Sequence, residues 1–246
     1  MQETSPGYND VLDRSGTFVT VGMLKPNLDT LPSRQRLLWR ELGPTPHHFV
    51  LYGGTALALR LGHRESVDFD FFSDRPFQPF ELLRSIPYLA NQRATQQAEN
   101  TLSCSVETAE GEVTISFFGS LPLRQIAPPD VAESNGISIA SLLDLFGTKC
   151  VTIAQRSESK DYLDIHALLT RTSLTLPEGI AAARAIYGRQ YDPLVTLQAL
   201  SYFADLAEPL DEVTKTDLLA AVGGLSLENL PTLSASTEIG AASSRP

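Results

Sequence analysis

The stretch that decides the fold is LYGGTALALRLGHRESVDFDFF, residues 51–72. It follows a short apolar run, Phe49–Tyr52, which ends at two adjacent glycines. A helical pattern over Thr55–Leu61 begins directly after the glycines, and Gly62 closes it. This order predicts a buried strand that turns tightly into a short helix.

The second half of the same stretch, Val67–Phe72, alternates apolar and acidic residues, which is the period of a β-strand. Asp68 and Asp70 are therefore expected on one face of the strand, with Val67 and Phe69 on the other. Two carboxylates at this spacing repel each other unless a cation lies between them. Mg²⁺ prefers oxygen ligands and is commonly shared with substrate phosphates, so the pair is a candidate Mg²⁺ site.

The glycine pair supplies a complementary feature. Gly53 and Gly54 let backbone N–H groups approach an anion, and the start of a helix adds partial positive charge, so a phosphate can bind there. Each motif alone has an ordinary structural explanation, as a tight turn or a solvated strand face. Together, and in this order, they favour a nucleoside triphosphate site.

Further strands and helices are expected on both sides of this stretch. We predict helices over 33–42, 80–83, 139–156, 160–169, 177–187, 192–206 and 210–222, and a hairpin formed by 101–108 and 112–118. The fold class is thus α+β followed by a helical C-terminal lobe. We expect an N-terminal arm over 1–32 with a short strand at 18–24, the core over 33–135, the lobe over 136–232, and a disordered tail over 233–246.

The composition excludes several classes of protein. With 246 residues, 42% of them apolar and 20% charged, the chain is of ordinary globular type. No apolar run is long enough to span a membrane, and the first residues carry no secretory signal. Two cysteines fit a reducing cytoplasm and argue against a zinc site built on Cys and His. The net charge of −10 argues mildly against a nucleic-acid-binding surface.

In the stretch 51–72 and in the helices expected further on, the chain resembles the AbiEii-type nucleotidyltransferase toxins, a family of the polymerase-β-like nucleotidyltransferase superfamily. The resemblance covers roughly residues 34–170 and implies a nucleotidyltransferase-like mixed sheet flanked by helices. The matching motifs are Gly53-Gly54-Thr55-Ala56-Leu57, His63-Arg64-x-Ser66-x-Asp68-x-Asp70-Phe71, Asp144-Leu145-x-x-x-Lys149, Arg156, and Lys160-Asp161-Tyr162-x-Asp164-Ile165.

The resemblance also implies roles for these residues. The catalytic set would be Asp68, Asp70, Lys149, Lys160, Asp161 and Asp164, with Asp68 and Asp70 binding Mg²⁺ or Mn²⁺ and the two lysines neutralising phosphate charge. The nucleotide-binding set would be Gly53, Gly54, Thr55, Arg64 and Ser66. The reaction would be attack of a hydroxyl on the α-phosphate of a nucleoside triphosphate, releasing pyrophosphate.

A type IV toxin of this family would act in the cytoplasm on an RNA acceptor such as tRNA, and a cognate antitoxin would be encoded nearby. Two other functions stay open. The chain could be a nucleotide-binding protein that acts through a protein partner without catalysis. It could also modify a cationic small molecule of the aminoglycoside kind, which its acidic charge would suit.

The chain departs from the superfamily pattern at the third carboxylate, which many members carry on a later strand. The position that we match to it is Ser116, and serine is a poor Mg²⁺ ligand and a poor base. Glu112, on the same face, lies about 13 Å further back at ~3.3 Å per residue.

Charged side chains on the C-terminal helices allow two interpretations. Lys149 and Arg156 are seven residues apart and share a helix face, which Lys160 joins if the helix is unbroken, as suits phosphate or RNA backbone. Alternatively, Lys160 forms an exposed i,i+4 pair with Asp164. Arg64 could likewise bind phosphate or orient Asp68 or Asp70. We expect His166 to serve in packing.

Overall fold

The computed structural model describes residues 8–12 and 18–236, and the chain divides into two compact units. Of the described residues, 8–12, 18–123 and 128–141 form the sheet unit, and 124–127 and 142–236 form the helical unit. Parts of the predicted N-terminal arm (1–7 and 13–17) and of the predicted tail (237–246) lie outside the described residues.

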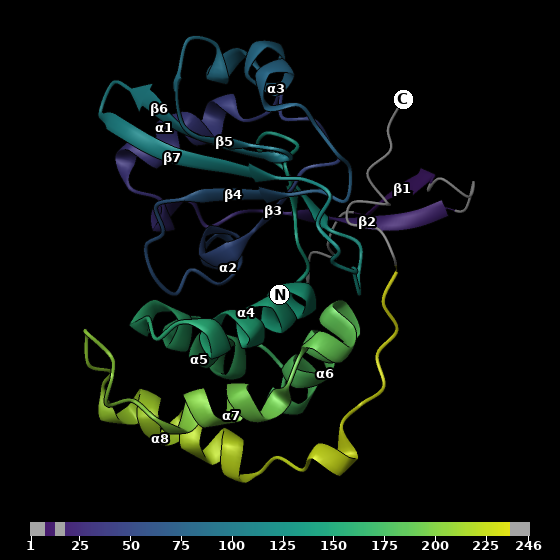
Figure 1. The fold of residues 1–246 in the computed structure, drawn as a ribbon, viewed down its shortest axis with the longest axis vertical. Coiled ribbons are helices and arrows are strands. Elements are labelled where there is room, and N and C mark those ends of the chain that lie inside the picture. The colour runs from purple at the N-terminus through teal and green to yellow at the C-terminus, as the bar shows by residue number, and fades with distance from the viewer. Residues whose placement is uncertain (1–7, 13–17, 237–246) are drawn as a thin grey trace, which may run out of the picture. The chain divides into compact units, whose positions relative to one another are not determined.

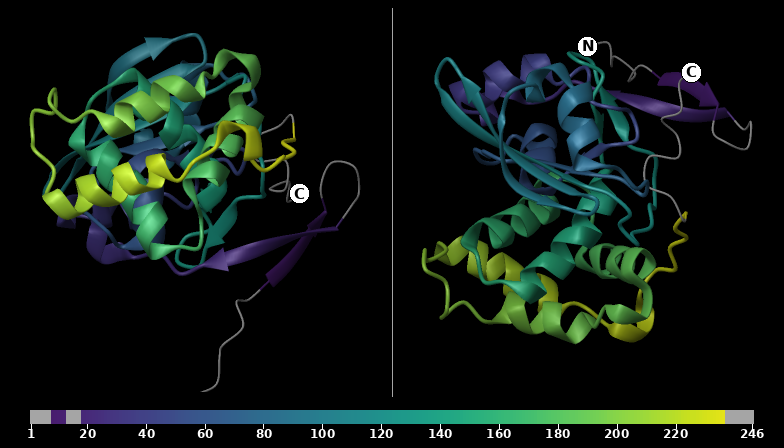
Figure 2. Two further views of the ribbon diagram at one scale, coloured as in Figure 1. Left: turned by 90° about the horizontal axis from the view of Figure 1, so that it is seen from below. Right: turned by 45° about the horizontal axis from the view of Figure 1, so that its top comes forward.

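The sheet unit is built on a mixed β-sheet, which confirms the α+β class (Figure 1). In the described residues its order is β1-β2-β8-β9-β3-β4-β7-β6-β5. The strands are β1 (Tyr8–Leu12), β2 (Phe18–Leu24), β3 (Val50–Tyr52), β4 (Phe69–Phe72), β5 (Arg93–Ala98), β6 (Thr101–Thr108), β7 (Gly111–Phe118), β8 (Asp130–Ala132) and β9 (Ser138–Ile139). The β1–β2 hairpin extends from one edge (Figure 2).

Three α-helices cover the sheet: α1 (Ser33–Glu41), α2 (Gly53–Leu61) and α3 (Pro79–Ser85). Helix α1 packs on β6 and β7, and its Trp39 ring stacks 6.2 Å from the ring of Phe69. Helix α2 packs on β3 and β4. Because side chains alternate along a strand, Phe69 and Phe71 are buried in the core while Asp70 points to the opposite face, toward α2.

The central strands largely follow the sequence prediction. Strands β6 and β7 pair antiparallel through a tight turn, as expected, with Gly111 at a φ of +117°. The prediction of a strand beginning at Val67 is wrong, because β4 starts at Phe69. Val67 is 42% exposed rather than buried in the core. Hydrogen bonds from outside the sheet hold the backbone of 66–68, as described below.

Strands β8 and β9 were not predicted, and they shift the boundary between the units. Strand β9 pairs in parallel with β3, so residues up to Ser141 belong to the sheet unit and the helical unit begins at Leu142. Arg60 of α2 binds the backbone at the end of β9. Its buried guanidinium donates to the carbonyl oxygens of Ile139 and Ala140, at 2.9 and 2.7 Å, and forms a 2.7 Å ion pair with Asp130.

The helical unit contains α4 (Leu142–Gln155), α5 (Ser159–Arg171), α6 (Leu176–Tyr187), α7 (Pro193–Ser201) and α8 (Glu212–Gly223). Helices α4 and α6 pack closely, since a Cβ on Gly147 would lie 2.8–2.9 Å from α6 atoms. The prediction that helix 192–206 continues past Ser201 is wrong, because the backbone at Tyr202 is extended. Of the predicted tail, residues 233–236 are described, and Ser236 forms a β-bridge with Gln125.

The structure also bears on the prediction that the chain spans no membrane. In the part of the chain that the structure describes, no helix combines the length and apolar character that a membrane crossing requires.

Candidate active site

The glycine pair at residues 53 and 54 lies where β3 ends and α2 begins. Gly53 has a φ of +74°, a conformation that L side chains rarely adopt. A Cβ built on Gly53 would lie 3.1 Å from Oδ2 of Asp70, so the carboxylate of Asp70 sits directly against the turn. Asp70 is fixed there by backbone pairing on both sides, with Tyr52 of β3 and Ser116 of β7.

Arg64 lies against the second glycine of the turn. A Cβ on Gly54 would come within 2.4 Å of an Arg64 guanidinium nitrogen and 3.4 Å of Oγ of Ser66. The other terminal nitrogen of Arg64 donates to the carbonyl oxygen of Glu65 at 2.8 Å. The start of α2 therefore has a carboxylate on one glycine and a guanidinium on the next, beside the positive end of the helix dipole.

Asp68 is placed differently from Asp70. It is exposed and precedes β4, so the expectation of two aspartates on one strand face is wrong for Asp68. Its backbone carbonyl oxygen accepts a hydrogen bond from Oγ1 of Thr55, the third residue of α2. The hydroxyl of Thr55 also lies 2.8 Å from that of Ser66. The predicted nucleotide-binding residues Thr55 and Ser66 thus link the glycine turn to the segment that carries Asp68.

Ser116 occupies the position next to Asp70 on the neighbouring strand. It is 6% exposed, and its hydroxyl lies 3.0 Å from that of Ser103. Glu112 is engaged elsewhere on β7, where it accepts a hydrogen bond from Ser105. Among residues 8–12 and 18–236 there is no cluster of three or more His, Cys, Asp or Glu residues suited to a metal ion.

The predicted metal ligands are therefore two carboxylates, Asp70 on β4 and Asp68 directly before it. This pair fits Mg²⁺ in the form that shares one or two protein carboxylates with substrate phosphates and keeps some of its water. It does not fit a cation that requires a closed site made entirely of protein ligands.

Lys149, Asp161 and Asp164 of the predicted catalytic set form a buried ion-pair cluster in the helical unit. Nζ of Lys149 lies 2.8 Å from Asp161 and 2.7 Å from Asp164. The Lys149 side chain is 6% exposed and both carboxylates are fully buried. Nε of Arg156 donates to Asp161 at 2.8 Å. Burial tends to raise the pKa of Asp161, but the hydrogen bonds and charges of Arg156 and Lys149 outweigh burial and lower it.

The cations of the predicted basic stripe are thus each held by carboxylates of the same unit. Lys160 pairs with Glu158 at 2.8 Å on the surface. The alternative expectation of a Lys160–Asp164 pair is wrong, because Asp164 binds Lys149. His166, expected in packing, bonds Asp217 at 2.8 Å.

The structure places the predicted site residues in two groups. The sheet unit holds Gly53, Gly54, Thr55, Arg64, Ser66, Asp68 and Asp70 around the start of α2, and the helical unit holds Lys149, Lys160, Asp161 and Asp164. Sequence reasoning missed Gln35, which donates from Nε2 to the carbonyl oxygen of Val67 at 3.0 Å. A lone polar residue on the buried face of α1 was the available signal.

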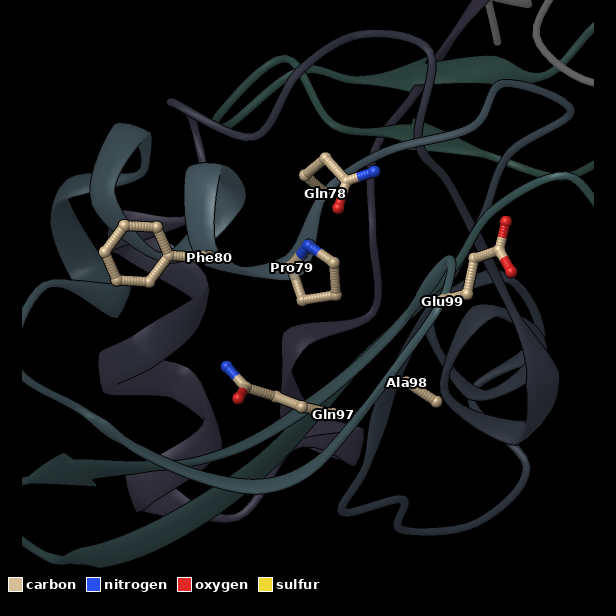
Figure 3. A pocket seen from close by; sticks show the side chains of 6 residues that line it. All are labelled: Gln78, Pro79, Phe80, Gln97, Ala98 and Glu99. Carbon is tan, nitrogen blue, oxygen red and sulfur yellow. The ribbon is translucent and has the colours of Figure 1, made fainter.

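The sheet unit has a surface groove between the start of α3 and the edge strand β5 (Figure 3). It is an open groove of about 520 Å³, lined by Gln78, Pro79, Phe80, Gln97, Ala98 and Glu99. These lining residues include one carboxylate and no cation or glycine turn. The groove therefore lacks the groups that would bind a triphosphate.

A mixed sheet with a glycine turn opening a helix beside an acidic strand is the arrangement of a nucleotidyltransferase. The family model for the nucleotidyl transferase AbiEii toxin of type IV toxin–antitoxin systems matches residues 36–217. The chain therefore belongs to the AbiEii family of nucleotidyltransferase toxins.

The chain is also similar to individual proteins. The chain is 36% identical over 167 residues to the uncharacterized protein aq_aa25 of Aquifex aeolicus (strain VF5), covering 67% of this chain and 78% of that protein. MenT4, a nucleotidyltransferase toxin of Mycobacterium tuberculosis H37Rv, superimposes with a TM-score of 0.50 at 16% identity, over 78% of this chain and 82% of MenT4, which shows a shared fold. A candidate nucleotidyltransferase from H. pylori gives a TM-score of 0.46 at 21% identity, over 77% and 90% of the two chains.

Proposed function

We propose that this protein is a Mg²⁺-dependent toxin that transfers a nucleotide from a nucleoside triphosphate to a hydroxyl of an RNA, tRNA in particular. It would act in the cytoplasm and be neutralised by a cognate antitoxin encoded nearby. The single observation that carries the proposal is the contact between the Gly53 turn and the carboxylate of Asp70, because it brings a phosphate-binding backbone next to a cation ligand.

The residues of the sheet unit divide the chemistry as follows. Backbone N–H groups at Gly53 and Gly54 bind triphosphate oxygens, and Arg64 adds a guanidinium that can bind them bidentately. Asp68 and Asp70 hold Mg²⁺, which when bound polarises the phosphate oxygens and stabilises charge on the leaving pyrophosphate. Serine at position 116, next to Asp70, supplies no carboxylate base, so the proton of the attacking hydroxyl would pass to solvent water.

We further propose that the Lys149 cluster supports the site by maintaining the helical unit rather than by contacting phosphate. Its ammonium group already has two carboxylate partners within 2.8 Å. Lys160, which is about half exposed and paired only at the surface with Glu158, is better suited to contact a polyanion.

Label transfer tests the function directly. The purified chain is incubated with each of four α-³²P-labelled nucleoside triphosphates, total RNA and Mg²⁺, with EDTA as the metal-free comparison. We expect label in RNA for the wild type and for the matched surface control Glu107→Gln. For Asp70→Asn we expect label transfer to fall by more than the roughly 10–100-fold that is typical when a group that only orients a metal ligand is lost.

Two results would contradict the proposal. Undiminished transfer by Asp70→Asn would remove the cation site from the reaction. In a parallel incubation with an aminoglycoside in place of RNA, label transfer to the aminoglycoside together with none to RNA would reassign the acceptor to a small molecule, which the net charge of −10 would suit.

A further inference from the structure

Three consecutive residues ahead of β4 are each held by a hydrogen bond from a different element. The N–H of Ser66 donates to Thr30 O at 3.1 Å, from the 3-10 helix Leu28–Thr30. The carbonyl oxygen of Val67 accepts from Nε2 of Gln35 on α1 at 3.0 Å. The carbonyl oxygen of Asp68 accepts from Thr55 on α2. The pairing of β4 with β7 begins only at Phe69, so these bonds, rather than a sheet ladder, fix the backbone that carries the Asp68 carboxylate.

The bond from Gln35 leaves the oxygen of the same side-chain amide buried and unsatisfied, which costs free energy. Gln35 is 1% exposed, and its Oε1 is buried without a hydrogen-bond partner. The amide cannot be turned over to satisfy that oxygen, because the carbonyl of Val67 can only accept and so requires the nitrogen. A methionine of similar size would fill the same space on α1 without burying an unsatisfied oxygen. The glutamine is therefore poorly explained by packing and well explained by the donor that it supplies to Val67.

The bond from Thr55 has a defined direction as well. A hydroxyl has one proton, and the Thr55 proton goes to the carbonyl of Asp68, which can only accept. The oxygen of the Thr55 hydroxyl also lies 2.8 Å from Oγ of Ser66. Both hydroxyl-bearing side chains are shielded from water, since Thr55 is 2% and Ser66 8% exposed. The chain Ser66–Thr55–Asp68 thus holds both ends of the segment.

We propose that Gln35 is a positioning residue for Asp68. By holding the Val67 carbonyl it sets where the Asp68 carboxylate lies, and hence how tightly a divalent cation is bound at Asp68 and Asp70. The inference rests on the proposed function, in which these two aspartates hold the cation. Thr55 contributes to the same task from the other side of the segment.

Mn²⁺ binding to the full chain, measured with the metal alone by electron paramagnetic resonance of free Mn²⁺, tests this without relying on catalysis. We expect Gln35→Met to bind Mn²⁺ about tenfold more weakly, as is typical when a group that orients a metal ligand is lost. Its midpoint of unfolding in urea should be no lower than that of the wild type. In label transfer, the Mg²⁺ concentration for half-maximal rate should rise by a similar factor.

The matched control is Thr45→Val, which removes another buried hydroxyl that donates to a backbone carbonyl, that of Leu42 at the end of α1. It should lower stability and leave Mn²⁺ binding unchanged, because Thr45 contacts neither aspartate segment. If Gln35→Met fails to fold, the pair Thr55→Val and Thr55→Ser decides. Valine should weaken Mn²⁺ binding, and serine, which keeps the hydroxyl, should restore it.

The results separate the two proposals. If Asp68→Asn weakens Mn²⁺ binding while Gln35→Met and Thr55→Val bind as the wild type does, the positioning role is overturned and the cation site stands. If Asp68→Asn and Asp70→Asn both bind Mn²⁺ like the wild type, the cation assignment itself fails.

Discussion

Replacing Lys149 with methionine tests whether the buried cluster of the helical unit supports the fold or serves the substrate. The side chain of Lys149 is 6% exposed, and its ammonium lies within 2.8 Å of two carboxylates that are fully buried. Methionine fills much of the same volume but removes the charge. Asp161 keeps its bond to Arg156, while Asp164 loses the 2.7 Å ion pair.

The size of the effect follows from that burial. Removing one partner of a buried ion pair costs about 3–5 kcal/mol, because a carboxylate remains in a medium that solvates it poorly. The matched control is Lys160→Met in the same helical unit. Its 2.8 Å pair with Glu158 is roughly half exposed on both sides, so the expected cost is about 0–1 kcal/mol.

The pH dependence gives a second signature. In the wild type the pKa of Asp161 lies below its ordinary value of 3.8, so its stabilising contribution is complete above that pH and is lost as the pH falls through the lowered pKa. In Lys149→Met the buried Asp164 carboxylate loses its 2.7 Å ion pair, and that loss costs less at a pH at which fewer carboxylates are charged. The variant then recovers stability as the pH falls, and its deficit relative to the wild type should be smaller at pH 5 than at pH 8.

Urea unfolding followed by circular dichroism at both pH values measures these differences, with label transfer assayed in parallel. A Lys149→Met chain that unfolds at the wild-type urea concentration yet transfers no label would refute the structural role. Lys149 would then have to act on phosphate. Restored stability in the double variant Lys149→Met, Asp164→Asn would support the structural role, because it removes the carboxylate charge whose ion pair with Lys149 is lost.

Three further predictions concern the sheet unit. Gly53→Ala forces an L residue to a φ of +74° and crowds Asp70, so it should cost about 1–2 kcal/mol in urea unfolding and abolish label transfer, and wild-type transfer would contradict the site. Ser116→Asp should lower the melting temperature without metal, and Mg²⁺ should raise it more than in the wild type; an equal Mg²⁺ response would mean that position 116 does not face the cation. Arg60→Met, which removes the partly exposed pair with Asp130 and the donors to Ile139 and Ala140, should cost about 1–3 kcal/mol in urea unfolding, and an unchanged midpoint would show that these contacts do not limit stability.

The parts of the fold that the sequence predicts are those with a local period or a specific turn. The β6–β7 hairpin and the glycine turn into α2 satisfy both conditions, and both are present. Strands β8 and β9, of three and two residues, are too short to show an alternating pattern. They form because β3 offers a partner edge and Arg60 binds the backbone that follows, and both are contacts between residues distant in the chain.

The candidate site shows the same division between local and non-local information. Asp70 could be placed from the alternation of its own strand, and the structure puts it against the glycine turn. The pairing of Lys149 with Asp164 could not be predicted from the sequence, because it joins two helices. The sequence equally allowed an i,i+4 pair between Lys160 and Asp164. Gln35 left only one clue, an amide on an otherwise apolar helix face.

The two aspartates of the site are therefore held by different physical means. Asp70 is fixed by main-chain pairing between β3 and β7, which side-chain substitution leaves in place. Asp68 depends on side-chain donors, Gln35 and Thr55, which reach its segment from two helices. We therefore expect the geometry at Asp68 to be the one that substitutions away from the glycine turn can alter. This unequal support explains why a buried glutamine that contacts neither substrate nor cation is expected to control how tightly the cation binds.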